Sequence, residues 1–284
     1  MTVLLEDPLI AGMAPATLLP LHESSRRLRE LCPACPRVYG VAVMADVGRR
    51  RWWPLSAALT TDRLQTMFLD AARVMDNRAA ASQLAATLAY AVVGRVVALV
   101  ILEGRAWDPG LENLWVHFDS EGDIDWAGVV DPTLRVLPDD PVDGEGVVRL
   151  PNQAALATWT AHRCHRALSP LFAQVHAVSR GALSVPAMWG MVGSAVVMAG
   201  TQIPQLAGSG DETGMRRGQA VLDAFANFGL PVRGGQRFPV HPERGPAIDA
   251  RGPVSSAVTR RVDNPLCQLR HYPSSARGST MKSG

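Results

Sequence analysis

Lysine and cysteine are both scarce in this sequence. Lys282 is the only lysine, so nearly all of the 28 basic residues are arginines, and their longest run is Arg49, Arg50 and Arg51. The formal net charge is only +2. Proteins that bind nucleic acids usually gather basic residues on one face or along one helix. The sequence therefore predicts no nucleic-acid partner, and its preference for arginine is typical of a GC-rich genome.

The four cysteines are too few for a disulfide framework in a chain of 284 residues. The first residues, MTVLLEDPLI, lack the basic segment before an apolar core that a secretory signal needs. Apolar runs also stay shorter than the ~18 residues of a membrane-spanning helix, because Arg95 interrupts the closest one, residues 89–102. We therefore expect a cytoplasmic protein with no membrane span.

Hydrophobic residues make up 47% of the sequence and charged residues 19%, which is typical of a globular protein with a sizeable core. Spacing near 3.6 residues predicts helices, and β-branched or alternating stretches predict strands. The expected helices run from Pro20 to a stop at Pro33 and over 61–75, 79–93, 152–178 (with a break at Pro170), 185–203 and 216–228. The expected strands cover 38–45 and 111–119, with a further strand after the next turn. Residues 96–102 fit either a helix or a strand.

These elements predict an α+β fold that is predominantly helical and has one small sheet in the N-terminal half. Residues 131–146 are rich in acidic residues and proline, as in LPDDPVDGEG. Such a composition favours an exposed linker. We therefore expect two units, an α+β half over residues 1–146 and a helical half with an irregular tail over residues 147–284.

Cys32 and Cys35 form a C-x-x-C motif, which can hold a reversible disulfide or half of a zinc site. No further zinc ligands lie nearby in sequence. A helix also precedes the pair, where a thioredoxin-type motif would have a strand. The two prolines among these residues favour the alternative interpretation, a rigid turn with partly buried thiols.

His162 and His165 are three residues apart on a predicted helix, so both can face one ligand or metal ion. The neighbouring Arg163 and Arg166 would suit an anionic iron chelate or the edge of a haem. The alternative is a solvated polar helix face. The residues alone leave haem, a mononuclear metal and no metal open at this pair.

Two segments resemble the FhuF-type ferric-siderophore reductases. Residues 79–118 contain an alanine-rich helix, a hydrophobic run and a short Leu/Trp strand, as in the middle of that family. The segment SVPAMWGMVGSAV, residues 184–196, is similar to the family signature L-W-G-N-x-A-S-A. The matching positions are Trp189, Gly190, Ser194 and Ala195, and the departures are Met188, Met191 and Gly193. The resemblance implies an FhuF-like fold.

The resemblance also implies a [2Fe–2S] cluster near the C-terminal end, held in the family by a Cys-Cys pair and a later C-x-x-C. The matching stretch here, LCQLRHYP, has Leu266 at the first ligand position and Cys267 at the second. Arg270 and His271 replace the family's Tyr-Arg, and no cysteine follows. Since such a cluster takes four protein ligands, we expect it to be lost unless histidine or the N-terminal C-x-x-C supplies the rest.

A pocket for an iron chelate is a further implication of the resemblance. Trp189 and Met191 would belong to its wall, and Arg260, Arg261 and Arg270 would face an anionic ligand. The alternatives are that Trp189 packs in the core and that the arginines are solvated. The sequence names no catalytic residue.

Three functions remain open at this point. The first is a small-molecule enzyme of a siderophore or natural-product pathway, without the cluster but with haem or a mononuclear metal near His162, His165 or Cys267. The second is a ferric-siderophore reductase with atypical cluster ligands. The third is a non-catalytic siderophore-binding or scaffold protein. Neither the substrate nor the oligomeric state follows from the residues.

The ligand count predicts that protein purified without oxygen contains no stoichiometric iron and no acid-labile sulfide. Iron and sulfide assays with a visible spectrum measure this directly, and a Soret band would reveal haem. Replacing Cys267 by Ser serves as the control, because it should leave the spectrum unchanged. Two irons and two sulfides per chain would show that the cluster is present.

Overall fold

The computed structural model describes residues 18–232 except 34, 36, 121 and 209–211. Its centre is one continuous helical run made of α4 (Asn77–Ala89), the π-helical turn η1 (Tyr90–Gly94) and α5 (Arg95–Glu103). The Asp76 side chain caps the start by accepting hydrogen bonds from the first turn, and Gly104, with a φ of 70°, ends it. Residues from Ala80 to Ile101 supply much of the buried core.

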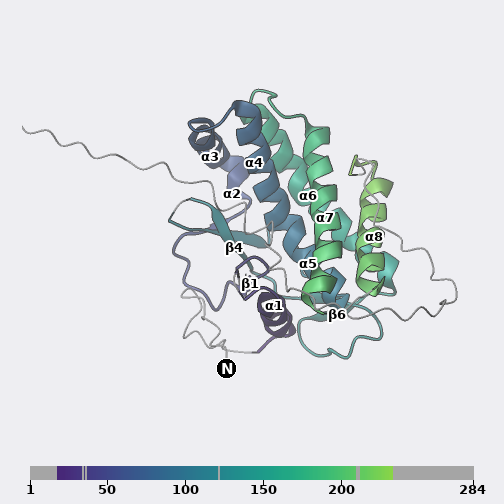
Figure 1. Cartoon of the computed structure of the whole chain (residues 1–284). Helices are drawn as coiled ribbons and strands as arrows, with labels where there is room; N and C mark the ends of the chain where they lie inside the picture. The colour runs from purple at the N-terminus through teal and green to yellow at the C-terminus, as the bar shows by residue number, and fades with distance from the viewer. Residues whose placement is uncertain (1–17, 34, 36, 121, 209–211, 233–284) are drawn as a thin grey trace, which may run out of the picture. The chain divides into compact units, whose positions relative to one another are not determined.

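The helices of the second half of the chain surround this run. They are α6 (Gln153–Val178), α7 (Val185–Leu206) and α8 (Glu212–Asn227), and the side chains of Asn152 and Ser184 cap the first two. In Figure 1, α4, α6 and α7 lie side by side, and α5 and α8 also pack against α7. The central run is long and apolar enough to cross a membrane, with a mean hydropathy of 2.2. However, 83% of its most apolar window is buried by these neighbours, as in the core helix of a globular protein.

A small sheet is formed by strands from the first half of the chain. Its strands are β1 (Val41–Val43), β2 (Trp52–Pro54), β3 (Leu114–Phe118) and β4 (Ile124–Val129), in the order β1-β4-β3-β2. β1 pairs with β4 in parallel, and the other pairs are antiparallel. A second, parallel pair consists of β5 (Leu134–Val136) and β6 (Val147–Arg149). The shorter helices before and beside the sheet are α1 (Pro20–Glu30), α2 (Ala57–Thr60) and α3 (Arg63–Ala72).

The predicted α+β class, with mostly helices and a small sheet in the N-terminal half, is confirmed. One detail differs from the expectation, and one alternative that the sequence left open is decided. Pro170 lies inside an unbroken α6, because packing on both sides outweighs the one backbone hydrogen bond that proline removes. Residues 96–102 are helical. Their β-branched side chains are accommodated because every position from Val96 to Ile101 is buried, so packing overrides intrinsic propensity.

The stretch 131–146 is not an exposed linker throughout. Leu134 and Val136 are fully buried in β5, and the Asp140 carboxylate accepts two hydrogen bonds from the Arg105 guanidinium at 2.8 and 3.0 Å. The acidic residues suggested solvent exposure, but one of them pairs with a buried arginine. All the described residues belong to a single compact unit, residues 1–239. A division at residue 146 stays a prediction.

Gly193 on α7 is required by a close backbone contact. A Cβ atom at this position would lie 1.9 Å from the carbonyl oxygen of Val232, which follows α8. A Cβ atom at Gly190, on the same helix, would meet nothing within 4 Å. The two glycines therefore form a matched pair for separating packing from helix propensity.

We expect Gly193→Ala to lower the free energy of unfolding by about 1–3 kcal/mol, because the backbone of residue 232 has to move. Gly190→Ala should instead raise it by about 0.5–1 kcal/mol, since alanine favours a helix and finds open space. Urea denaturation followed by circular dichroism measures both. Equal effects of the two substitutions would show that the contact with Val232 is unimportant.

Candidate functional site

An irregularity between the two central strands, β3 and β4, brings a buried carboxylate next to a histidine. On β3 the residues His117 and Phe118 are consecutive, whereas their partners on β4 are Trp126 and Ile124. Asp125 is therefore the extra residue of a β-bulge. Bulges redirect side chains and are frequent beside active sites. Here the bulge turns the Asp125 side chain toward His117, where it has no exposed surface.

Asp125 links a histidine and an arginine into one chain of hydrogen bonds. Its Oδ1 lies 2.6 Å from Nδ1 of His117, and its Oδ2 accepts a hydrogen bond of 2.6 Å from Nη1 of Arg37. The positive charge of Arg37 compensates the buried carboxylate. Because the ionised carboxylate can only accept, it holds the proton of the imidazole on Nδ1. Nε2 of His117 is then left as the reactive nitrogen.

These residues line an open cavity of about 380 Å³, which we call the polar pocket. Its lining consists of Arg37, Arg50, Arg51, His117, Asp119, Ser120 and Asp125. Three arginines against two aspartates leave a net formal charge of +1 before His117 takes up a proton. The volume lies within the range of small-molecule sites. The lining therefore favours a small anionic ligand.

Two of the arginines in the polar pocket, Arg50 and Arg51, are exposed, and their donors bind no protein group among the described residues. Arg51 also has a φ of 63°, a left-handed conformation that non-glycine residues rarely adopt. Such strain persists where the surrounding structure imposes it and is concentrated at functional sites. Its carbonyl is held by the backbone N–H of Phe118 at 3.3 Å.

The arrangement can bind an oxyanion and move a proton. Unpaired guanidinium groups offer planar pairs of donors that match carboxylate or phosphate oxygens. Nε2 of His117 makes no hydrogen bond with the described residues, so it is available to accept a proton from a bound ligand or to return one. The Asp125 carboxylate stabilises the imidazolium that this transfer produces.

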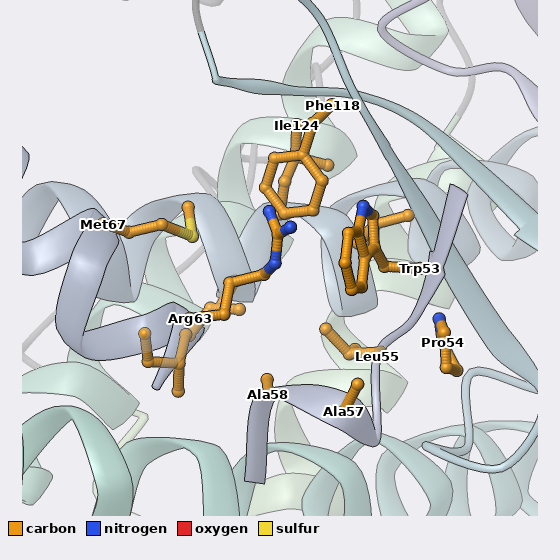
Figure 2. A pocket seen from close by; sticks show the side chains of 12 residues that line it. Trp53, Pro54, Leu55, Ala57, Ala58, Arg63, Met67, Phe118 and Ile124 are labelled. Atoms are coloured by element: carbon orange, nitrogen blue, oxygen red, sulfur yellow. The ribbon is translucent and has the colours of Figure 1, made fainter. Parts of the chain in front are cut away.

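Another small hollow lies across the sheet and has a different character. Figure 2 shows the guanidinium of Arg63 between the rings of Trp53 and Phe118, at 3.8 and 4.6 Å from the ring centroids. Burial lowers the pKa of Arg63, although not to a range where it loses its charge. The hollow beneath it is apolar and holds only about 20 Å³, which is room for one water molecule or methyl group. It has no space for a substrate.

The structure places Trp189 inside the helical core. Trp189 is 4% exposed, and its ring packs edge-on against Phe172 with the ring centroids 5.1 Å apart. The ring centroids of Phe225 and His165 lie 6.3 and 5.5 Å away. Met191 is half-buried on the same helix, α7. Neither residue lines the polar pocket. Their role in ligand binding stays a prediction, and the surroundings of Trp189 are those of a core aromatic.

The remaining predicted ligand-binding arginines, Arg260, Arg261 and Arg270, lie outside the described residues. Cys267, the remnant of the expected cluster motif, also lies outside them.

His162 and His165 lie on α6 and pack against the same aromatic ring. The centroid of Phe228 is 5.9 Å from that of His162 and 6.0 Å from that of His165. Arg163, predicted to attract an anion here, instead donates to Asp108 at 2.7 Å and to Glu112. Among the described residues, no group of three or more histidine, cysteine, aspartate or glutamate side chains is arranged to hold a metal ion.

Among the cysteines of the described region, Cys32 and Cys164 carry thiol groups, whereas Cys35 is disulfide-bonded. Cys164 is fully buried in α6, and burial raises the pKa of its thiol far above the usual range. Cys32 is 7% exposed. The backbone N–H of Cys35 donates to the carbonyl of Cys32 at 2.9 Å, so the motif forms a turn after α1, as the two prolines suggested.

Sequence reasoning missed His117 and Asp125. The strand LWVHF was predicted, with Leu114, Val116 and Phe118 on one face, and all three are buried. The signal that could have drawn attention is the second face, because a histidine in a buried strand and an aspartate in the next strand both need partners. The bulge that joins them leaves no recognisable pattern in the sequence.

Comparisons with protein families, with curated proteins and with solved structures find no match to this chain.

The surroundings of His165 predict a pH dependence of stability. Burial, and then the neighbouring His162, lower the pKa of His165 below its ordinary value. The unfolded chain therefore binds more protons between that lowered pKa and about 6.5. The contribution of His165 to the free energy of unfolding is fully present above this pH window and is lost as the pH falls through it.

We expect His165→Phe, which keeps a ring against Trp189 and Phe228, to lose less melting temperature than the wild type between about pH 7 and about pH 5. His162→Gln should raise the pKa of His165 in an NMR titration, because it removes a neighbouring positive charge. Identical pH profiles for the wild type and His165→Phe would contradict this account.

Proposed function

We propose that this protein is a small-molecule enzyme that binds an anionic substrate in the polar pocket and uses His117 as a general acid and base. The observation that carries the proposal is the Arg37–Asp125–His117 chain in a pocket with two unpaired guanidinium groups. A protein that only bound an anion would need the arginines. It would not need a buried carboxylate that fixes the protonation of an imidazole.

Each side chain has a distinct part in the proposed reaction. Arg50 and Arg51 hold the anionic group of the substrate by charge-assisted hydrogen bonds. Nε2 of His117 takes a proton from the bound substrate. Asp125 keeps the imidazole in the Nδ1–H form and stabilises its protonated state, while Arg37 balances the charge of Asp125 when the pocket is empty.

The resemblance to FhuF-type reductases gives this proposal a substrate class. Siderophores and related natural products carry carboxylate, catecholate or hydroxamate oxygens, all of which become anionic and suit guanidinium donors. We propose that such a molecule, free or as its iron chelate, is the substrate. We also propose that the protein has an FhuF-like fold, acts in a siderophore or natural-product pathway and is located in the cytoplasm.

Binding of inorganic phosphate, measured by titration calorimetry, tests the anion site. Arg51→Asn removes the guanidinium but tolerates the left-handed conformation. It should weaken phosphate binding by roughly tenfold to a hundredfold, since a hydrogen bond to a charged group contributes about 1.5–3 kcal/mol. Arg49→Asn is the matched control, because Arg49 lies in the same loop but packs against Trp115 outside the polar pocket.

Proton uptake during phosphate binding tests the role of His117. A bound anion favours the imidazolium, so calorimetry in buffers with different ionisation enthalpies should detect a fractional proton taken up per phosphate. The uptake should be smaller in His117→Gln, where only the change in protonation of phosphate itself remains. Phosphate binding that is absent, or equal in the wild type and Arg51→Asn, would overturn the proposal.

A further inference from the structure

A buried arginine lies directly behind the polar pocket. Arg95, the first residue of α5, is 1% exposed although it carries a full charge. Its Nη1 donates to the carbonyl oxygens of Arg37 at 2.8 Å and Gly40 at 2.7 Å. Its Nη2 donates to the carbonyl oxygen of Asp125 at 2.8 Å. One guanidinium thus holds the backbone of two residues whose side chains form the proposed site.

The positions of the three carbonyl groups that Arg95 binds indicate more than the compensation of a buried charge. A buried guanidinium needs acceptors to offset the loss of water, but any carbonyls in the interior would serve that purpose. Arg95 instead bridges two segments that are far apart in sequence, the turn before β1 and the bulge of β4. The distance between the Arg37 and Asp125 side chains depends on how these two backbones are spaced.

The π-helical turn lets the side chains of Tyr90 and Arg95 bind the same stretch of backbone. Tyr90 begins η1, and its hydroxyl donates to the carbonyl oxygen of Val38. In a regular α-helix, residues five apart point about 140° away from each other. The wider π turn, with its i→i+5 hydrogen bonds, brings Tyr90 and Arg95 closer to one face. Both side chains can then bind carbonyls of the same turn, residues 37–40.

Gly94 completes this arrangement. A Cβ atom at Gly94 would lie 2.5 Å from the ring of Tyr90. The guanidinium carbon of Arg95 lies 5.6 Å from the centroid of the same ring. The ring therefore packs against the helix backbone only because residue 94 has no side chain. π-helical turns inside α-helices are frequent at functional sites.

We propose that Arg95, aimed by the π turn, is a positioning residue for the polar pocket. By fixing the carbonyls of Arg37 and Asp125 it sets the geometry of the Arg37–Asp125–His117 chain, and so holds His117 in the Nδ1–H form. Arg95 does not line the polar pocket, so it acts through these residues and not on the ligand. The inference rests on the proposed function for its biological meaning, but its structural consequence is measurable without a ligand.

The test uses the full chain and compares the buried Arg95 with the half-buried Arg217. Arg95→Met removes the bridge between the two segments. Arg217→Met is the matched control, because Arg217 also donates to two backbone carbonyls, those of Ile101 and Leu102, far from the polar pocket in sequence. Both substitutions should lower the melting temperature. Nitrogen NMR of the His117 imidazole then reports its tautomer, and calorimetry reports phosphate affinity.

We expect Arg95→Met to give a mixture of His117 tautomers and to weaken phosphate binding by roughly tenfold or more, as for the loss of one strong hydrogen bond. Arg217→Met should keep the Nδ1–H tautomer and the wild-type affinity. If Arg95→Met does not fold, Arg95→Lys decides the question. A single ammonium group does not span the carbonyls on both sides, so the tautomer should shift there too.

The inference would be overturned if His117 kept the Nδ1–H tautomer of the wild type in Arg95→Met, even if that variant were less stable. If only Arg95→Lys folds, the same result in that variant would overturn it. The tautomer is measured without phosphate. If the wild type fails to bind phosphate, the proposed function falls while the positioning role of Arg95 is still decided by the tautomer.

Discussion

A carboxylate without exposed surface must be surrounded by donors, and Asp125 imposes this requirement on the N-terminal half of the protein. Its side chain is satisfied by His117 and Arg37, and its backbone carbonyl by Arg95. An uncompensated buried charge would cost several kcal/mol, more than most single interactions contribute. The strand that carries it, the turn before β1 and the start of α5 are therefore held in one relative position.

The two faces of the small sheet have different surroundings. Trp53, Val116 and Phe118 face the helices and line the tight apolar hollow beneath Arg63. On the other side, His117 packs beside Trp52, whose ring centroid is 5.4 Å away, and reaches the polar pocket. Because side chains alternate along a strand, adjacent residues of β3 serve the core and the site. The sheet packs against η1 of the central helical run and against the short helices α1 and α2.

The helices were predictable because their hydrophobic spacing is a local property. Residues 61–75 and 185–203 correspond to α3 and α7 within a few residues, and the side chain of Ser184, directly before α7, caps that helix. The site was not predictable in the same way. His165 and Trp189 attracted attention as unusual residues on helices, yet they pack together in an aromatic cluster. An interior aromatic and a binding-site aromatic have the same local sequence pattern.

The sequence by itself determined the class of fold and the position of most helices. Tertiary structure alone decided that Arg37, Asp125 and His117 meet. Arg37 and Asp125 are 88 residues apart in sequence, and a β-bulge brings Asp125 next to His117. It also decided that residues 96–102 are helical, since burial on all sides outweighs β propensity. Local patterns record which elements form, whereas contacts between elements depend on the packing of the whole core.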